Sequence, residues 1–440
     1  MNVNFAGISG KDIDYAIECL EVCRQEHARE YGFNHPYFTP GGQYGKQWWQ
    51  LDSSLALCGY KWVDREFAQR ALLNFAESQR EDGRICLWGK DVLPNGVAGG
   101  DFPLQTEGVS SLPKLFDAAF GILRGTVDRA FKISIYEMLK KYLDWWFADR
   151  QDAKTGLITA VFEETFIPYL GYAGEYAPVD TNVEVCVGCR CVELLARELG
   201  KDADADEAQA RGEALKVSIN RYLWNEEKGA YYPYFVKEDR MGDCLMSSTL
   251  YPLRLCIAPK ERQERLIRLM KDSAHFNWDT LPLTSVSKKD PIFKTTQGRY
   301  KGNASWSGNV WSLINETVVR GLMDCGYRSL AGELAMKTLR AFSGNCTEFI
   351  DPFDGSGHGV QQYAWTASQY LELTVECIFG VDYNANEESV TVSPCIPGEL
   401  EKMCFELTSL SLEGGIFLDV TVEGGKVTAK SGDPTLVIKA

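Results

Sequence analysis

The hydrophobic positions along the first 380 residues recur every three or four residues, which is the spacing of amphipathic helices. This pattern predicts twelve helices joined by alternating short and long links. The short links follow the second, fourth, sixth, eighth and tenth helices, and the long links follow the odd-numbered ones. The predicted helices are 11–30, 51–60, 64–80, 108–123, 127–149, 182–199, 204–223, 244–255, 259–270, 309–325, 327–341 and 364–379.

The alternation of links has a geometric meaning, because antiparallel helical neighbours reverse direction at each link and every second link lies at the same end. Twelve helices in six hairpins can close into a double ring. The sequence therefore predicts an all-α fold, an (α/α)6 toroid or six-hairpin barrel, with its long links at one rim. Since loops longer than about 12–15 residues are usually functional in a compact domain, we expect the functional cleft at that rim.

The pattern changes after Gly380, where β-branched or alternating segments separated by glycines predict strands. We therefore expect a barrel catalytic domain over 1–380 and a small C-terminal antiparallel β-sheet over 381–440. No linker rich in Ser, Gly or Pro precedes the sheet, so we expect it to pack on the barrel. The predicted strands are 389–392, 404–412, 416–423 and 435–438.

Composition limits the classes of partner. The chain has 46 Lys and Arg against 61 Asp and Glu, and its formal net charge of −15 would repel a nucleic-acid backbone. The 45% of hydrophobic residues suffices for a large core, but the apolar runs are shorter than the roughly 20 residues of a membrane span. The first residues have neither the basic nor the apolar region of a signal peptide. We expect no nucleic-acid partner and no membrane association.

Fourteen cysteines are scattered along the chain without the spacing of a disulfide framework, which predicts reduced, buried thiols in a cytoplasmic protein. The tightest cluster is Cys186, Cys189 and Cys191, whose spacing along one predicted helix is typical of helix packing. A zinc site would need a second pair of Cys or His residues, and none appears. We expect no metal and no cofactor, and the oligomeric state stays open.

The long links contain groups of aromatic and acidic residues. Sugar rings present apolar faces that stack on indole rings, and their hydroxyl groups need hydrogen bonds from carboxylate and amide side chains. Glycosidic cleavage further needs two carboxyl groups, one as acid and one as base. The predicted partner is therefore a small saccharide. The candidate substrate-binding residues are Trp48, Trp49, Asp52, Gln105, Asp180, Asn182, Trp306, Trp311, His358 and Trp365.

Several ordered motifs resemble those of the toroidal inverting glycosidases of glycoside hydrolase families 63 and 37, most closely the bacterial mannosylglycerate-hydrolase-like branch. The resemblance spans roughly residues 45 to 400. Each motif alone is loose, but their order along the chain is specific. The motifs are Trp48-Trp49-Gln50-Leu51-Asp52-Ser53, Gln79-Arg80-Glu81-Asp82-Gly83-Arg84-Ile85, Thr155-Gly156-Leu157, Pro178-Val179-Asp180-Thr181-Asn182, Gly308-Asn309-Val310-Trp311 with Asn315, and Tyr363-Ala364-Trp365-Thr366-Ala367.

The resemblance implies an inverting, exo-acting glycoside hydrolase whose general base is Glu348, just before the Tyr363 motif. The family's general acid is an Asp ahead of the Pro178 motif, and this chain has no Asp there. Glu164, or failing it Glu163, is the predicted acid, and the other Glu is then free for a sugar hydroxyl or a buried basic partner. Asp180 is the fallback.

Two alternatives remain open. The missing Asp is compatible with a non-catalytic sugar-binding relative that has lost its acid. A sugar lyase or epimerase on the same toroid would use His358 and a tyrosine as proton shuttles. Only four histidines are present, which favours the carboxylate mechanism.

Overall fold

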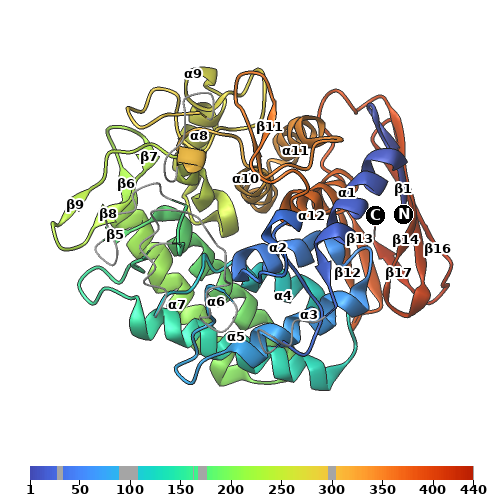
Figure 1. Cartoon of the computed structure of the whole chain (residues 1–440), viewed down its shortest axis with the longest axis horizontal. Coiled ribbons are helices and arrows are strands. Elements are labelled where there is room, and N and C mark those ends of the chain that lie inside the picture. The colour runs from blue at the N-terminus through green and yellow to red at the C-terminus, as the bar shows by residue number, and fades with distance from the viewer. Residues whose placement is uncertain (27–32, 89–107, 162, 167–175, 296–303, 440) are drawn as a thin grey trace.

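The computed structural model describes residues 1–26, 33–88, 108–161, 163–166, 176–295 and 304–439. The described chain is mainly helical, with several small sheets (Figure 1). Six elements contact one another in a closed cycle, in which each touches the next and the last returns to the first. In order they are α2 (Gln50–Tyr60), α4 (Leu115–Arg124), α6 (Val179–Leu199), the 3₁₀ segment η5 (Ser247–Cys256), α10 (Ser312–Asp324) and α12 (Ala364–Glu372).

Six further helices pack against the outside of this cycle (Figure 1). Each outer helix has one buried side and one exposed side, whereas every residue of the inner helices α2 and α12 is buried. The inner and outer elements alternate along the chain, as the spacing of the links predicts. The outer helices are α1 (Gly10–Cys23), α3 (Arg65–Ser78), α5 (Arg129–Asp149), α7 (Asp202–Ser218), α8 (Lys260–Met270) and α11 (Arg328–Phe342).

Close approach of α2 and α12 joins the first and last inner helices. A Cβ atom at Gly59 would collide with the backbone carbonyl of Ser368, so only glycine fits at this crossing. The Gly59 amide donates to Ser368 Oγ at 2.7 Å, and that hydroxyl donates to the Leu55 carbonyl at 2.7 Å. Small residues thus bring residues more than 300 positions apart into direct backbone contact.

The helix boundaries differ from the predicted ones at two inner elements, η5 and the start of α6. The predicted helix 244–255 is the 3₁₀ segment η5, because Pro252 lacks an amide hydrogen and Arg254 and Leu255 leave the helical conformation. Helix α6 begins at Val179, after Pro178. Asp180 therefore lies in its first turn and is not the N-cap.

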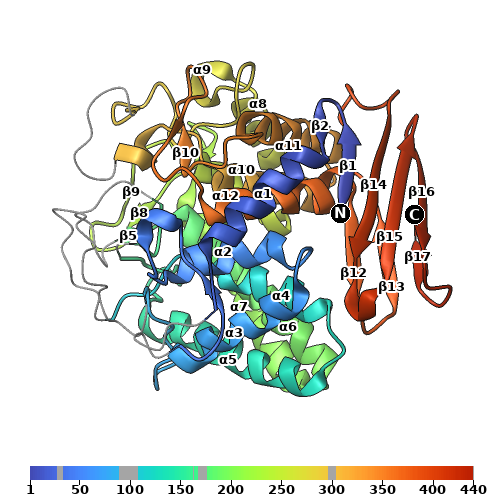
Figure 2. The same cartoon turned by 45° about the vertical axis from the view of Figure 1, so that its right-hand side comes forward.

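The C-terminal strands form two sheets, where the sequence predicts one antiparallel sheet (Figure 2). In the larger sheet, β1 (Asn2–Phe5) and β2 (Ile8–Ser9) extend an antiparallel array of β14 (Cys404–Ser411), β15 (Phe417–Glu423) and β16 (Lys426–Ser431). In the smaller sheet, β17 (Val437–Lys439) runs parallel to β13 (Ser389–Val392), which pairs with β12 (Val381–Asn384). The first nine residues thus belong with the C-terminal strands.

The long links carry short strand pairs. They are β3 (Arg24–Gln25) with β4 (Tyr37–Phe38), β5 (Tyr176–Ala177) with β8 (Tyr234–Phe235) and β9 (Arg240–Met241), β6 (Trp224–Asn225) with β7 (Ala230–Tyr231), and β10 (Phe349–Ile350) with β11 (Gly357–His358). In Figure 2, β5, β8, β9 and β10 lie on the side of the helices away from the C-terminal sheets. The short helix α9 (Ser273–Phe276) and the π-helical turns η4 (Ile219–Leu223) and η7 (Leu373–Ile378) complete the main elements.

A network of charged side chains, most of them buried or half-buried, joins all six inner elements, and Lys61 directly after α2 represents that helix. Lys114 Nζ lies 3.1 Å from Asp117 Oδ2 and 3.2 Å from Glu184 Oε1, and Arg254 Nη1 lies 3.1 Å from Asp117 Oδ2. Arg320 Nη2 lies 2.9 Å from Glu376 Oε2. The network consists of Lys61, Lys114, Asp117, Glu184, Arg254, Glu316, Arg320, Asp324, Glu372 and Glu376.

Six carboxyl groups face four cations in this network. Burial raises the pKa of Glu184 and of Glu372 to about 7, against the opposing charges of Lys114 and Arg320 respectively. Near neutral pH both groups therefore carry a proton part of the time, which reduces the excess of negative charge. The charges of Lys61 and Arg320 overcome the effect of burial on Glu376 and lower its pKa to about 2.

No helix among the residues that the structure describes is long and apolar enough to cross a membrane. Within the same residues, no group of three or more His, Cys, Asp or Glu side chains is arranged to hold a metal ion. Cys186, Cys189 and Cys191 are buried, and Cys189 packs near Gly212 at the contact between α6 and α7. Their structural role is helix packing.

Replacing Lys114 by Met tests the network. The change leaves buried carboxylates on Asp117 and Glu184 without their shared cation, so we expect it to lower the free energy of unfolding by about 3–5 kcal/mol. Thermal and urea denaturation would measure the loss. The matched control is Lys140→Met, which removes the cation paired with the half-exposed Asp144. It should lower the free energy of unfolding by about 1 kcal/mol or less. Equal losses in the two variants would contradict a special role for the network.

Candidate active site

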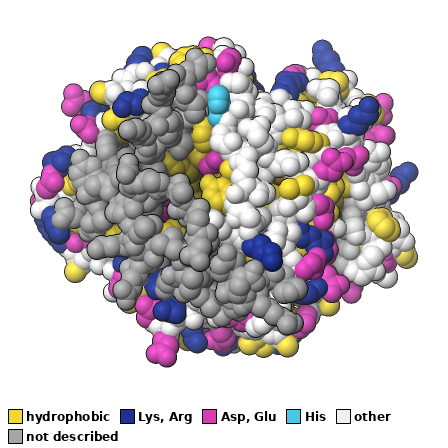
Figure 3. Space-filling view, in the orientation of Figure 1, with side chains coloured by type: hydrophobic (Ala, Val, Ile, Leu, Met, Phe, Trp, Pro, Cys, Tyr) yellow, Lys and Arg dark blue, Asp and Glu magenta, His cyan; other side chains and the backbone are white. Residues whose placement is uncertain are grey.

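Three carboxyl groups from distant segments meet where the inner helices begin. Asp52 lies in the first turn of α2, Glu163 lies in the link between α5 and α6, and Glu348 directly precedes β10. The charges of Asp52 and Glu348 both act on Glu163, and the charge of Asp52 acts on Glu348. The space-filling view shows a hollow near the middle of one face, with hydrophobic and acidic side chains in it (Figure 3).

Burial raises the pKa of all three carboxyl groups to about 7. For Glu163, the negative charges of Asp52 and Glu348 act in the same direction as burial. For Asp52, the hydrogen bond from Tyr363 opposes burial, because Tyr363 Oη donates to Asp52 Oδ1 at 2.7 Å and stabilises the carboxylate. A site with these groups can both donate and accept protons near neutral pH.

Backbone contacts hold Glu348 in place. The Glu348 amide donates to the Val360 carbonyl at 2.8 Å, and the Val360 amide donates back to Glu348 Oε2 at 3.1 Å. Gly359 has a φ of +72°, and a Cβ atom there would collide with the Glu348 carboxyl group. Glycine at 359 therefore lets the backbone pass directly beside this side chain.

Glu163 and Glu164 occupy different environments. Glu164 is fully buried and forms a two-bond ion pair with Arg150, with Nε–Oε2 at 2.8 Å and Nη2–Oε1 at 2.9 Å. The amides of Ser110 and Val161 also donate to its two oxygens. Glu164 thus has the buried basic partner expected for one Glu of the pair. Glu163 adopts a φ of +64°, a strained conformation that separates its side chain from that of Glu164.

Asp180 and Asn182 anchor the segment that carries Glu163. Asp180 accepts hydrogen bonds from the Thr165 hydroxyl at 2.9 Å and the Phe166 amide at 2.7 Å. Its carboxylate therefore holds in place the two residues that follow Glu164. Asn182 exchanges hydrogen bonds of 2.8 Å with the backbone of Ile158. Both side chains are fully buried, which makes them positioning residues and not substrate contacts.

The candidate tryptophans divide into a core member and two clusters. Trp48 is 1% exposed and packs on Phe33 and Phe75 with ring centroids 5.1 Å apart, so it belongs to the core and not to a sugar subsite. Trp49 packs edge-on against Trp88 at 4.8 Å and lies near Tyr44.

The second cluster links the segment after Glu163 to the segment after Glu348. Trp306 stacks on Trp311 with centroids 3.7 Å apart and an interplanar angle of 8°, and on Phe166 at 4.7 Å. Trp311 in turn contacts Phe349 and Trp365. Trp306 is partly exposed, whereas Trp311 and Trp365 are buried, so Trp306 is the member of this cluster with surface that a ligand can reach.

His358 and Gln105 complete the predicted set. His358 lies on β11, its Nε2 is 2.9 Å from Ser356 Oγ, and its ring stacks at 6.4 Å on Phe349, next to Glu348. Gln105 lies outside the described residues.

The structure adds three residues that the sequence analysis did not assign to the site. Tyr44 lies within reach of all three carboxyl charges, which together with burial raise its pKa. Tyr363 is the hydrogen-bond donor to Asp52, and Arg150 neutralises Glu164. Tyr363 begins one of the resemblance motifs, which is a usable signal, but nothing local in the sequence points to Tyr44 or Arg150.

A comparison with protein families gives a match over residues 45–165 and 168–366 to the mannosylglycerate hydrolase MGH1-like glycoside hydrolase domain. The chain belongs to this glycoside hydrolase family. The match includes Asp52, Glu163, Glu164 and Glu348, so the carboxyl site lies inside the family domain.

Three further proteins are similar to this chain in sequence. A mannosylglycerate hydrolase of Rubrobacter radiotolerans is 22% identical over 81% of this chain and 97% of its own length. A periplasmic trehalase of Citrobacter koseri is 25% identical, over 37% of this chain and 26% of that protein. An uncharacterized protein of Borreliella burgdorferi is 25% identical over 61% of this chain, and the match spans about half (54%) of that protein's length.

Solved structures share the fold. The GH63 mannosylglycerate hydrolase of Thermus thermophilus, solved with glucose, superposes with a TM-score of 0.67 at 21% identity, over 82% of this chain and 99% of that one. A GH78 rhamnosidase of a Bacillus species superposes with a TM-score of 0.69 at 18% identity, over 98% of this chain and 41% of that one.

The different environments of the two glutamates predict opposite effects on stability. Glu164→Gln breaks the buried pair with Arg150 and should lower the free energy of unfolding by about 3–5 kcal/mol. Glu163 binds its proton more tightly in the folded protein, so its contribution to stability is present below a pH of about 4.5 and is lost as the pH rises through about 7. Glu163→Gln should therefore stabilise the protein at pH 8 relative to wild type, with little effect at pH 5.

Melting temperatures of the two variants and wild type at pH 5 and pH 8 measure both effects. A Glu163→Gln variant that is destabilised as much as Glu164→Gln at pH 8 would show that Glu163 is also a structural anion.

Proposed function

We propose that this member of the family is an inverting, exo-acting hydrolase of a small glycoside. The observation that carries the proposal is the meeting of Asp52, Glu163 and Glu348, three carboxyl groups with pKa values raised to about 7, beside the aromatic cluster of Trp306. Hydrolysis of a glycosidic bond needs one protonated and one ionised carboxyl group on opposite faces of the bond. Both protonation states are available near neutral pH in this cluster.

We further infer that the cycle of six inner elements with six outer helices is an (α/α)6 toroid. The alternation of inner and outer elements along the chain supports this interpretation, as does the likeness to toroidal glycosidases. The division into a barrel over 1–380 and a β-region over 381–440 stays a prediction, with β1 and β2 as members of the second part. A cytoplasmic location also stays a prediction.

In the proposed mechanism, Glu163 is the general acid and Glu348 the general base. Burial and the charges of Asp52 and Glu348 favour the protonated form of Glu163, which gives its proton to the glycosidic oxygen as the bond to the anomeric carbon breaks. Glu348 takes a proton from a water molecule, whose oxygen bonds to the opposite face of that carbon. The hydrogen bond from the Val360 amide favours the ionised form that a base requires. The product sugar then has the inverted anomeric configuration.

Glu163, not Glu164, is the better acid because the Glu164 carboxylate is bound by Arg150 and two amides. Asp180 is also unsuited, since its oxygens hold Thr165 and Phe166. The carboxylate of Asp52 is left to bind a sugar hydroxyl or to orient the water.

The relatives suggest the class of substrate. Two of the sequence relatives are a mannosylglycerate hydrolase and a periplasmic trehalase, enzymes of small glycosides. We propose a compact glycoside of this kind, and mannosylglycerate and trehalose are the first two compounds to assay. Turnover with inversion, followed by NMR of the first product, supports the proposal. Binding without turnover would favour the non-catalytic alternative, and an unsaturated or epimerised product would favour the lyase or epimerase.

Glu348→Gln tests the base. The amide keeps the shape and one hydrogen-bond acceptor but cannot take a proton, so we expect kcat to fall by about 10²–10⁴-fold while the protein still binds sugar. Steady-state kinetics and calorimetric titration of the sugar measure the two effects. The control is Glu399→Gln, which changes a surface ion pair with Arg340 and should keep wild-type turnover. A Glu348→Gln enzyme with near-normal kcat would rule out this role.

Glu163→Gln tests the acid. Activated aryl leaving groups depart without protonation, so the variant should lose far more activity on natural glycosides than on nitrophenyl glycosides. In wild type, the loss of the acidic proton should lower kcat/KM as the pH rises above about 7, and this alkaline limb should disappear for nitrophenyl substrates in the variant. Equal losses on all leaving groups, with the alkaline limb unchanged, would exclude Glu163 as the acid.

A further inference from the structure

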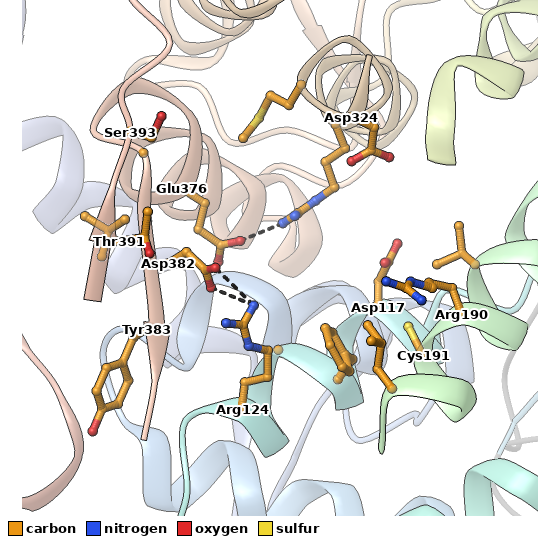
Figure 4. A pocket seen from close by; sticks show the side chains of 18 of the residues that line it. Asp117, Arg124, Arg190, Cys191, Asp324, Glu376, Asp382, Tyr383, Thr391 and Ser393 are labelled. Carbon is orange, nitrogen blue, oxygen red and sulfur yellow. Dashed lines mark hydrogen bonds and ion pairs between the residues drawn. The ribbon is translucent and has the colours of Figure 1, made fainter. Parts of the chain in front are cut away.

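A second pocket lies at the other end of the inner helices. Lys61 follows the last residue of α2, Asp324 ends α10, and Glu376 lies in η7 after α12, and all three line the pocket. Asp52 lies in the first turn of α2 and Lys61 directly follows the helix, so the rise of the helix puts about 14 Å between the two sites. Figure 4 shows this pocket from close by, with Arg124 and Arg190 among its lining side chains.

Basic side chains outnumber acidic ones in the pocket, although the chain as a whole carries a net charge of −15. Among the described residues, seven basic ones line it: Lys61, Arg65, Arg124, Arg190, Arg254, Arg320 and Arg328. The four acidic ones are Asp117, Asp324, Glu376 and Asp382. We call this site the basic pocket.

All four carboxylates of the basic pocket are already paired with its own cations. Arg254 pairs with Asp117 and Asp324, and Arg124 pairs with Asp382 at 2.9 Å (Figure 4). The fourth, Glu376, pairs with Lys61 at 2.7 Å and with Arg320 at 2.9 Å. Three guanidinium groups therefore have no carboxylate partner within the lining: Arg65, Arg190 and Arg328.

Arg65 is the one of these groups with buried donor nitrogens that make no hydrogen bond to a described residue. Its side chain is 10% exposed, and neither Nε nor Nη2 makes a hydrogen bond to any described residue. Its nearest carboxylate is Glu413, 3.9 Å away, and burial lowers the pKa of Arg65. A buried guanidinium with unused donors is costly in a native protein unless a ligand or ion supplies the missing acceptors.

The other two groups are held beside the pocket by weaker contacts. Arg328 donates to the Ser393 carbonyl and lies beside the Cys395 thiol, and it forms no ion pair with any described carboxylate. Arg190 pairs at 2.9 Å with Glu193, which is outside the lining, and its side chain is 48% exposed. Planar guanidinium groups match the oxygen geometry of phosphate and carboxylate groups.

We propose that the basic pocket binds a small phosphate monoester, such as a sugar phosphate. A dianionic phosphate would supply acceptors to the unused donors of Arg65 and would lie beside guanidinium groups that have no carboxylate partner within the lining. The cavity volume of about 510 Å³ is in the range of small-ligand sites. Trp62, Phe120 and Tyr383 give it apolar surface against which the carbon skeleton of the ester can pack.

Calorimetric titration of the full chain with glucose 6-phosphate tests the proposal, with inorganic phosphate and glucose as comparison probes. Glucose 6-phosphate should bind and should raise the melting temperature, inorganic phosphate should bind more weakly, and glucose should show no binding that depends on the basic pocket. Arg65→Met and Arg190→Met should each weaken glucose 6-phosphate binding by about tenfold or more, because each removes a charge-assisted hydrogen bond. Arg190 is half-exposed, so its variant is the one least affected by misfolding.

Two controls separate this pocket from the carboxyl site and from general charge effects. Glu348→Gln should bind glucose 6-phosphate like wild type, which keeps the test independent of the proposed hydrolase. Arg268→Met removes an exposed charge of α8 and should also bind like wild type. The proposal fails if glucose 6-phosphate does not bind at millimolar concentration, or if binding survives both pocket variants. Binding lost in Glu348→Gln would assign the phosphate to the carboxyl site.

Discussion

Every inner element of this fold contributes a charged side chain, from the element or from the residue next to it, to one largely buried network, and the rest of the structure depends on that arrangement. Charges of this kind can be buried only when each carboxylate finds a cation or takes up a proton. Lys114 and Arg254 meet Asp117 from different elements, and Arg320 meets Glu372 and Glu376 from a third. Because partners come from all round the cycle, a shift of any one inner element would leave buried charge unpaired.

The network also separates two sites of opposite electrostatic character. Where the inner helices begin, Asp52, Glu163 and Glu348 gather with no cation paired to any of them among the described residues. Where the helices end, the four carboxylates of the basic pocket are paired with its own cations, and three guanidinium groups have no carboxylate partner within the lining. The carboxyl site is thereby suited to proton transfer and the basic pocket to an anion. The ion pair of Glu164 with Arg150 serves the first site, since it fixes the segment in which Glu163 is held in its strained conformation.

Sequence periodicity was sufficient for most of the helices, because the outer helices have one buried face whose hydrophobic residues recur every three to four positions. The hydrophobic pattern did not predict the conformation of segments in which burial is not the deciding factor. Pro252 interrupts a segment whose hydrophobic pattern is helical, and the result is the 3₁₀ segment η5. The pairing of Asn2–Phe5 with Cys404–Ser411 could not be predicted from the sequence either, since strand partners about 400 residues apart leave no local signal.

The sequence by itself determined the order of the helices, the rim at which acidic and aromatic residues gather, and the family motifs that point to Glu348. Tertiary structure alone decided what each of these residues does. Trp48 and Trp49 are neighbours in the chain, yet one lies in the core and the other beside Tyr44. Glu163 and Glu164 are equally adjacent, and only the position of Arg150 makes one a structural anion and leaves the other free to carry a proton. The physical reason is that a carboxyl group's role follows from its burial and from the charges around it, and residues distant in the sequence supply both.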